Sequence, residues 1–173
     1  NGENTGGDNN EDNKPANPQA LTLQQIINDT NAGEEIDLSK YKLTNYNATI
    51  NKKLTIKNGN LDGAKLTVNV ENVKLDKLEK VSVETTSKLT INDSKLNDLL
   101  ISGNRETSRS RATESEMSLA MVSVTGCEIA QVQLDGFNSQ LNITDTATEI
   151  DDIFTSTKAK LILEAGSYDG MKD

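Results

Sequence analysis

The chain contains no histidine and no tryptophan, and only 3% of its 173 residues are aromatic. Without histidine it cannot form a His-based catalytic triad, use a histidine general base or bind zinc through imidazole. Sugar rings commonly stack on Trp and Tyr, so the few aromatic residues weaken the case for a carbohydrate-stacking site. The apolar fraction of 34% is also low, which argues against a large irregular core.

Cysteine, positive charge and long apolar runs are scarce as well. Cys127 is the only cysteine, which excludes an intrachain disulfide and a thiolate zinc site, and we expect it to be a buried structural residue. Lys and Arg number 18 against 27 Asp and Glu, so the net charge is −9. This acidity argues against binding to nucleic acid or to an anionic membrane surface. No run of about 18 apolar residues is present, so we expect no segment to cross a bilayer.

What the chain does contain is a short pattern that recurs about every 20 residues. Two aliphatic residues flank one outward residue; a corner residue follows two positions after the second aliphatic, and a small residue comes next. We call the second aliphatic residue of each pair an anchor, and the anchors are Ile56, Ile91, Val124, Ile143 and Leu163. Ile36, where the strand-like pattern begins, is the anchor that precedes them. The corner position holds Asn58, Asp93, Gly126, Asp145 or Ala165, and the small position holds Gly59, Ser94, Cys127, Thr146 or Gly166. Such self-similarity predicts a solenoid, in which each coil buries its apolar face against its neighbours.

The spacing of the anchors gives most of the register. Ile143 and Leu163 lie one period apart, and the longer step from Ile91 to Val124 also becomes one period if residues 103–116 are an insertion. Val70 fits as an additional anchor between Ile56 and Ile91, although the coil that ends at Val70 would then be unusually short. The 20 asparagines agree with many tight corners, because Asn tolerates left-handed backbone and caps its own turn.

Three segments depart from the repeat. Residues 1–20 contain no aliphatic residue larger than Ala and are rich in Asn, Gly, Asp, Glu and Pro, so we expect a disordered tether. Residues 22–31 predict a capping helix, with a capping box between Thr22 and Gln25 and an apolar face of Leu23, Ile26 and Ile27. Residues 103–116 are polar and predict a mobile loop that projects from the stack.

The segment from Leu54 to Gly63 resembles a coil of the right-handed parallel β-helix, the pectate-lyase-like fold, and residues 21–38 resemble the N-terminal cap and first strand of that superfamily. The resemblance implies an all-β domain over residues 21–173: a right-handed parallel β-helix solenoid of about six to seven coils with a short N-terminal capping helix. The leucine-rich repeat is the competing solenoid, but its L-x-x-L-x-L-x-x-N spacing is not sustained. Residues 1–20 are similar to the spacer of bacterial surface lipoproteins, which implies a lipid anchor upstream of Asn1; a plain disordered N-terminus is the alternative.

Enzymes of this fold cleave polysaccharides, so the resemblance directs attention to acidic residues. Its lyases hold calcium with carboxylates and use a basic residue as proton acceptor, and its hydrolases use grouped aspartates. The candidates are Asp93 and Asp98, and the group Asp145, Asp151 and Asp152. The pectin hydrolases, which Asp151-Asp152 superficially resembles, also carry a motif with histidine, which is missing here, and no convincing basic residue lies on a strand beside the acids. We therefore expect structural corner acids, with no catalytic residues, no metal site and no cofactor.

The sequence favours a non-enzymatic extracellular domain at a bacterial cell surface, acting as a scaffold, an adhesin or a binding module. Its partner is either a polysaccharide or a host or cell-surface protein. Arg105, Arg109 and Arg111, in the predicted loop, are candidate contacts to an acidic glycan or partner. A small polysaccharide lyase or glycoside hydrolase is one alternative. A structural protein that self-associates through its C-terminal edge is another, because no cap is obvious after the last repeat.

Overall fold

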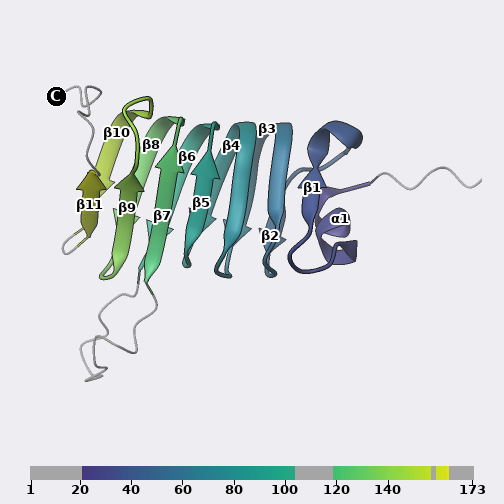
Figure 1. Cartoon of the computed structure of the whole chain (residues 1–173), viewed down its shortest axis with the longest axis horizontal. Coiled ribbons are helices and arrows are strands. Elements are labelled where there is room, and N and C mark those ends of the chain that lie inside the picture. Colours follow the sequence, from purple (N-terminus) through teal and green to yellow (C-terminus); the bar gives the residue numbers. More distant parts are fainter. Residues whose placement is uncertain (1–20, 104–118, 157–158, 164–173) are drawn as a thin grey trace, which may run out of the picture.

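The computed structural model describes residues 21–103, 119–156 and 159–163, which wind around one long axis as a parallel β-solenoid of about six turns (Figure 1). Every pairing between its named strands is parallel. In chain order the elements are α1 (Leu23–Asp29), β1 (Glu35–Asp37), the 3-10 helix η1 (Leu38–Lys40), β2 (Ala48–Ile50), β3 (Thr55–Val68), β4 (Val73–Thr85), β5 (Leu89–Asn92), β6 (Lys95–Ser102), β7 (Ala120–Thr125), β8 (Glu128–Asp135), β9 (Ser139–Ile143), β10 (Glu149–Thr155) and β11 (Lys160–Leu163). The solenoid predicted from the repeat is therefore confirmed.

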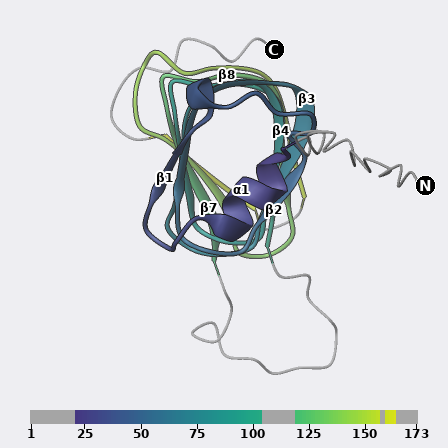
Figure 2. The same cartoon turned by 90° about the vertical axis from the view of Figure 1, so that its right-hand side faces the viewer.

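Each turn contributes to two faces of the stack. The first face consists of β1, the start of β3, the start of β4, and then β5, β7, β9 and β11. The second face consists of β2, the end of β3, the end of β4, and then β6, β8 and β10. Viewed along the stack, the turns superpose into one outline, and α1 lies across part of its opening (Figure 2).

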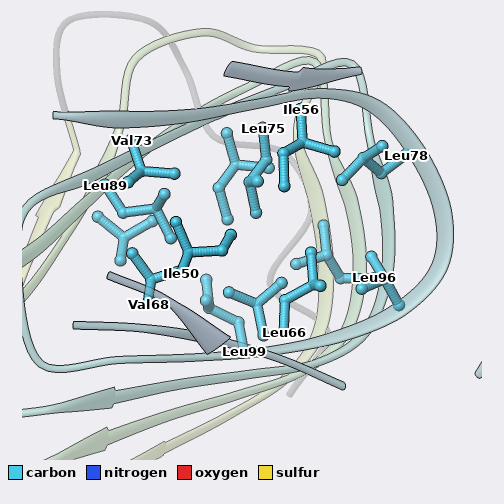
Figure 3. Close-up of a cluster of buried hydrophobic side chains, with 14 of the residues drawn as sticks. Ile50, Ile56, Leu66, Val68, Val73, Leu75, Leu78, Leu89, Leu96 and Leu99 are labelled. Carbon is cyan, nitrogen blue, oxygen red and sulfur yellow. The ribbon is translucent and has the colours of Figure 1, made fainter. Parts of the chain in front are cut away.

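A column of aliphatic side chains fills the space between the two faces (Figure 3). Strand pairing aligns the anchors in one row: Ile36, Ile56, Leu75, Ile91, Val124, Ile143 and Leu163. The first six are at most 2% exposed. Burial of an aliphatic side chain contributes about 1.5–3 kcal/mol, so this row and its neighbours supply the main driving force for folding.

The anchor between Ile56 and Ile91 is Leu75, and the assignment of Val70 was wrong. Ile56 pairs with Leu75, which in turn pairs with Ile91. Val70 is only partly buried and lies in the corner between β3 and β4. The coil that ends at Leu75 is therefore longer than the coil that follows it. The difference is absorbed in the corners, where no pairing constrains the length of the chain.

The small position after Ile143 also differs from the expectation. Thr146 is exposed, whereas Thr148 is buried and its hydroxyl accepts a hydrogen bond from the Cys127 N–H at 3.3 Å. Ile150 then pairs with Ile129 of the preceding turn. This corner is longer than the pattern allows, so Thr148 takes the place that the sequence assigned to Thr146.

The predicted capping helix is present, but it is shorter than residues 22–31. Thr22 and Gln25 form the capping box, and the helix ends at Asp29 because Thr30 closes it with two hydrogen bonds to the Ile26 carbonyl. Leu23, Ile26 and Ile27 are buried against the first turn.

The long step from Ile91 to Val124 forms a single turn, because β6 and β7 both stay in register with their neighbours. The predicted tether at 1–20 and, except for Gly103, the predicted loop near 103–116 lie outside the described residues.

Candidate functional site

The first corner of each turn is built from residues that accept left-handed backbone. Asn58, Lys77, Asp93 and Gly126 each lie two positions after an anchor, and their φ values are 59°, 52°, 46° and 63°. A non-glycine residue with positive φ is uncommon, and Asn and Asp are the side chains that tolerate it best. Asn58 and Asp93 therefore have the structural corner role that the sequence predicts, and Lys77 is the least suited of the four.

Asp145 is held in the same corner by a small hydrogen-bond network. Its carboxylate accepts from the Thr148 hydroxyl at 2.6 Å and from the Gly126 N–H at 2.8 Å. Partial burial alone would raise the pKa of Asp145, but these hydrogen bonds favour the charged form and lower the pKa overall. Asp145 is thus used to bind one turn to the next.

Cys127 lies inside the stack beside this corner. Its side chain is buried, and its thiol donates weakly to the Ile91 carbonyl at 3.4 Å. Burial raises the pKa of the Cys127 thiol, which disfavours the nucleophilic thiolate. The residue behaves as a small core side chain.

The remaining candidate acids occupy different surfaces. Asp98 and Asp152 share one outward row of the second face, with Gln131 between them, and Asp98 accepts a hydrogen bond from the Ser82 hydroxyl at 2.9 Å. Asp151 lines a hollow on this face, near the N-terminal ends of β6, β8 and β10. The fold therefore does not bring Asp145, Asp151 and Asp152 together as one group.

This hollow, of about 240 Å³, does place acids beside lysines that the sequence did not connect with them. Its charged lining residues are Lys80, Lys95, Glu128, Glu149 and Asp151. Lys95 and Glu128 form an ion pair at 2.9 Å, and the hydrogen bond and charge of Glu128 raise the pKa of Lys95. The sequence does not reveal this grouping, because these residues meet only once the turns are stacked in register. Within the described part of the chain, no group of three acids or thiols is arranged to hold a metal ion.

A second hollow, of about 380 Å³, lies between α1 and the second face. Its amides are occupied by structural bonds. Gln24 accepts from the Thr49 N–H at 2.8 Å and donates to the Thr49 carbonyl at 3.2 Å, and Asn47 accepts from the Lys65 N–H at 2.8 Å. These contacts fix the cap to the first turns.

An uncharged patch covers three turns of the first face, at β5, β7 and β9, and ends at β11, where Lys160 and Ile162 occupy the outward positions. Its outward residues on three successive turns are Thr90, Asn92, Met121, Ser123, Thr125, Gln140, Asn142 and Thr144. The earlier turns of the same face carry charged outward residues, among them Glu35, Lys57 and Asp76. Charged residues make up 26% of the chain, so an unbroken set of neutral outward positions sets this surface apart. The sequence alone does not reveal the patch, because outward positions are known only once the register is known.

Hydrogen bonds order part of the uncharged patch. The Thr125 and Thr144 hydroxyls lie 2.6 Å apart, and the Gln140 side-chain amide donates to the side-chain oxygen Oδ1 of Asn142 at 2.8 Å. Asn142, which its neighbours cover almost completely, donates to the Met121 sulfur at 3.4 Å. Thr90 is exposed and Ser123 is partly exposed, and each adds a hydroxyl to the patch. The result is a flat sheet surface with both donors and acceptors.

Comparison with protein-family models, curated protein sequences and solved structures yields no match. No helix in the described part of the chain is long and apolar enough to cross a membrane. Arg105, Arg109 and Arg111 lie outside the described residues, so their predicted role as contacts stays a prediction.

Proposed function

We propose that the protein is a non-enzymatic extracellular β-solenoid of the pectate-lyase-like kind, which acts as a binding module or adhesin at a bacterial surface. The composition of residues 1–20, similar to a lipoprotein spacer, supports a tethered domain with a lipid anchor upstream. A solenoid suits this role, because each turn extends one continuous surface without changing the core.

The uncharged patch is the observation that carries the proposal. Strands in a sheet lie about 4.8 Å apart, and alternate residues of one strand lie about 6.7 Å apart, so hydroxyl and amide groups form a regular two-dimensional array. A repeating array fits a ligand that repeats, and hydroxyls and amides match the hydroxyl groups of an uncharged polysaccharide. Met121 is the only apolar side chain in the patch, whereas the core of a protein–protein interface is more apolar. We therefore favour an uncharged glycan, bound by hydrogen bonds rather than by stacking.

The test is a broad polysaccharide array, probed with the full chain and with two variants. Ser123→Lys places a charge in the centre of the uncharged patch, and Gln131→Lys places the same charge on the second face of the same turn. We expect binding of an uncharged glycan class that Ser123→Lys weakens at least tenfold and Gln131→Lys leaves unchanged. Equal effects of the two variants, or a blank array, would refute the glycan proposal. Specific capture of a cell-surface protein instead would leave the adhesin role with a different partner.

A small polysaccharide lyase or hydrolase is the second candidate, and the hollow beside β6, β8 and β10 favours it. One observation counts against a lyase that uses Lys95 as its base. A lyase base must be unprotonated, and pairing with Glu128 stabilises the protonated form of Lys95. The assay is release of unsaturated or reducing ends from any glycan that binds, in the presence of calcium. Turnover that Asp151→Asn abolishes, with binding retained, would establish the enzyme and displace the non-enzymatic proposal.

Self-association is the third candidate role, and it is supported by the exposed apolar side chains of the last turn.

Deletion of residues 103–116 tests the predicted loop contacts: unchanged binding would confine the site to the faces of the solenoid.

A further inference from the structure

The row of anchors is buried along the whole stack except at its last member. The six anchors from Ile36 to Ile143 are at most 2% exposed, whereas Leu163 is 45% exposed in the same inward row. Ile162 and Phe154, on the same last turn, are 38% and 54% exposed. Three of the five exposed large apolar side chains of the described residues therefore lie in β10 and β11.

The two ends of the stack differ. At the N-terminal end α1 covers the core, and Leu23 and Ile27 are fully buried there (Figure 2). At the other end β10 pairs only with β8, and β11 only with β9, among the described residues (Figure 1). Within residues 21–103, 119–156 and 159–163, the outer edges of β10 and β11 have no strand partner and lie beside exposed apolar side chains, and a further strand pairs with such an edge.

We propose that a second copy of this chain covers this end, in a two-fold dimer that joins the C-terminal turns of two solenoids. Stacking in one direction would require the N-terminal end of the next copy, and α1 occupies that end. A two-fold contact uses the same edge on both copies and closes on itself, so it gives a dimer and not a fibre.

A two-fold dimer of this kind can pair β10 either with the β10 or with the β11 of the other copy, and charge favours the second arrangement. Pairing β10 with the β10 of the other copy brings Glu149, Asp151 and Asp152 beside their own equivalents. Pairing β10 with the β11 of the other copy brings these acids near Lys160, and β11 carries no acid. The second arrangement is electrostatically complementary, and it forms twice in the dimer. It leaves the uncharged patch of both copies free, so this inference does not depend on the proposed binding function.

The experiment is analytical ultracentrifugation of the full chain across concentration, up to about 1 mM, where even a weak complex with Kd in the millimolar range is populated. We expect a dimer. Lys160→Glu should weaken it at least tenfold at low salt, with a smaller effect at high salt because exposed charges are screened. Leu163→Lys should abolish it. Tyr41→Lys, a charge added to an exposed apolar residue elsewhere on the stack, is the control and should leave the dimer intact.

Two results would overturn the proposal. A full chain that stays monomeric to about 1 mM shows that something other than a second copy covers Leu163. A dimer that is insensitive to both Lys160→Glu and Leu163→Lys has its interface elsewhere. Lys160 is exposed and has no ion pair among the described residues, so its variant keeps the test valid even if Leu163→Lys disturbs the last turn. Circular dichroism of each variant reports whether the solenoid is retained.

Discussion

Replacing Leu75 by alanine tests the register of the coil on which sequence and structure disagree. Leu75 is fully buried, and the anchors Ile56 and Ile91 above and below it are fully buried too. The cavity left by Leu75→Ala would be closed in by these rigid neighbours, so little relaxation is available. Leu→Ala substitutions in such sites cost about 3–4 kcal/mol, which combines lost burial with the cavity left behind.

Val70→Ala is the matched control, because Val70 would be the core residue if the sequence-derived register were right. In the structure Val70 lies in a corner and is only partly buried. Removing its two methylene equivalents, each worth about 0.8 kcal/mol when fully buried, should cost less than about 1 kcal/mol. The expected difference between the two variants is therefore at least about 2 kcal/mol.

Urea unfolding, followed by far-UV circular dichroism, measures both losses. With an m-value of about 2 kcal/mol/M, a loss of about 3 kcal/mol shifts the midpoint by about 1.5 M. Solenoids can unfold in parts, so the m-value of each variant has to equal that of the parent chain before the free energies are compared. Equal losses, or a larger loss for Val70→Ala, would refute the register and with it the placement of the uncharged patch.

Three further substitutions test the corners. In Gly103→Ala the added Cβ would collide with the Phe137 carbonyl oxygen, so the backbone must shift. We expect the free energy of unfolding, measured in urea, to fall by about 1–3 kcal/mol. An unchanged midpoint would contradict this contact. Lys77→Asn relieves left-handed strain that costs an ordinary side chain about 1–2 kcal/mol, so the thermal midpoint should rise, and a fall would show that Lys77 has another role. The pKa of Asp145 is lowered by folding, so its contribution is present above the ordinary pKa of about 3.9 and is lost as the pH falls through the lower folded value. Asp145→Asn should therefore destabilise the chain at neutral pH but much less near pH 2; a pH-independent difference would exclude the carboxylate as the cause.

The fold could be predicted because the inward residues repeat, and the errors arose where corners change length. Aliphatic alternation marked six of the seven anchors, since each must fill the same column. Between Ile56 and Ile91 two corners have unequal lengths, so spacing alone could not choose between Val70 and Leu75. The longer corner beside Asp145 shifted the small position to Thr148 for the same reason.

The candidate surfaces were harder to predict, because they depend on register in a way that the core does not. The hollow joins Lys80, Lys95, Glu128 and Asp151, which come from different turns and have no shared spacing in the chain. An error of a single position in any corner would turn a strand's outward residues inward. Local sequence could identify Asp93 and Asn58 as corner residues, since that role depends on backbone geometry within one turn.

The two proposals together have a geometric consequence that neither has alone. In the dimer that pairs β10 with the β11 of the other copy, the first face of one solenoid lies on the same side of the dimer as the second face of its partner. The two uncharged patches then point in opposite directions, so one dimer would join two polymer chains instead of gripping one chain at two points. We expect the parent protein to cross-link a long glycan that it binds, seen as turbidity, whereas Leu163→Lys binds short oligosaccharides equally well without cross-linking. Equal turbidity from the dimer and the monomeric variant would rule out this arrangement. Tighter binding of long chains by the dimer without turbidity would place both patches on one side, and so favour pairing of β10 with its own equivalent.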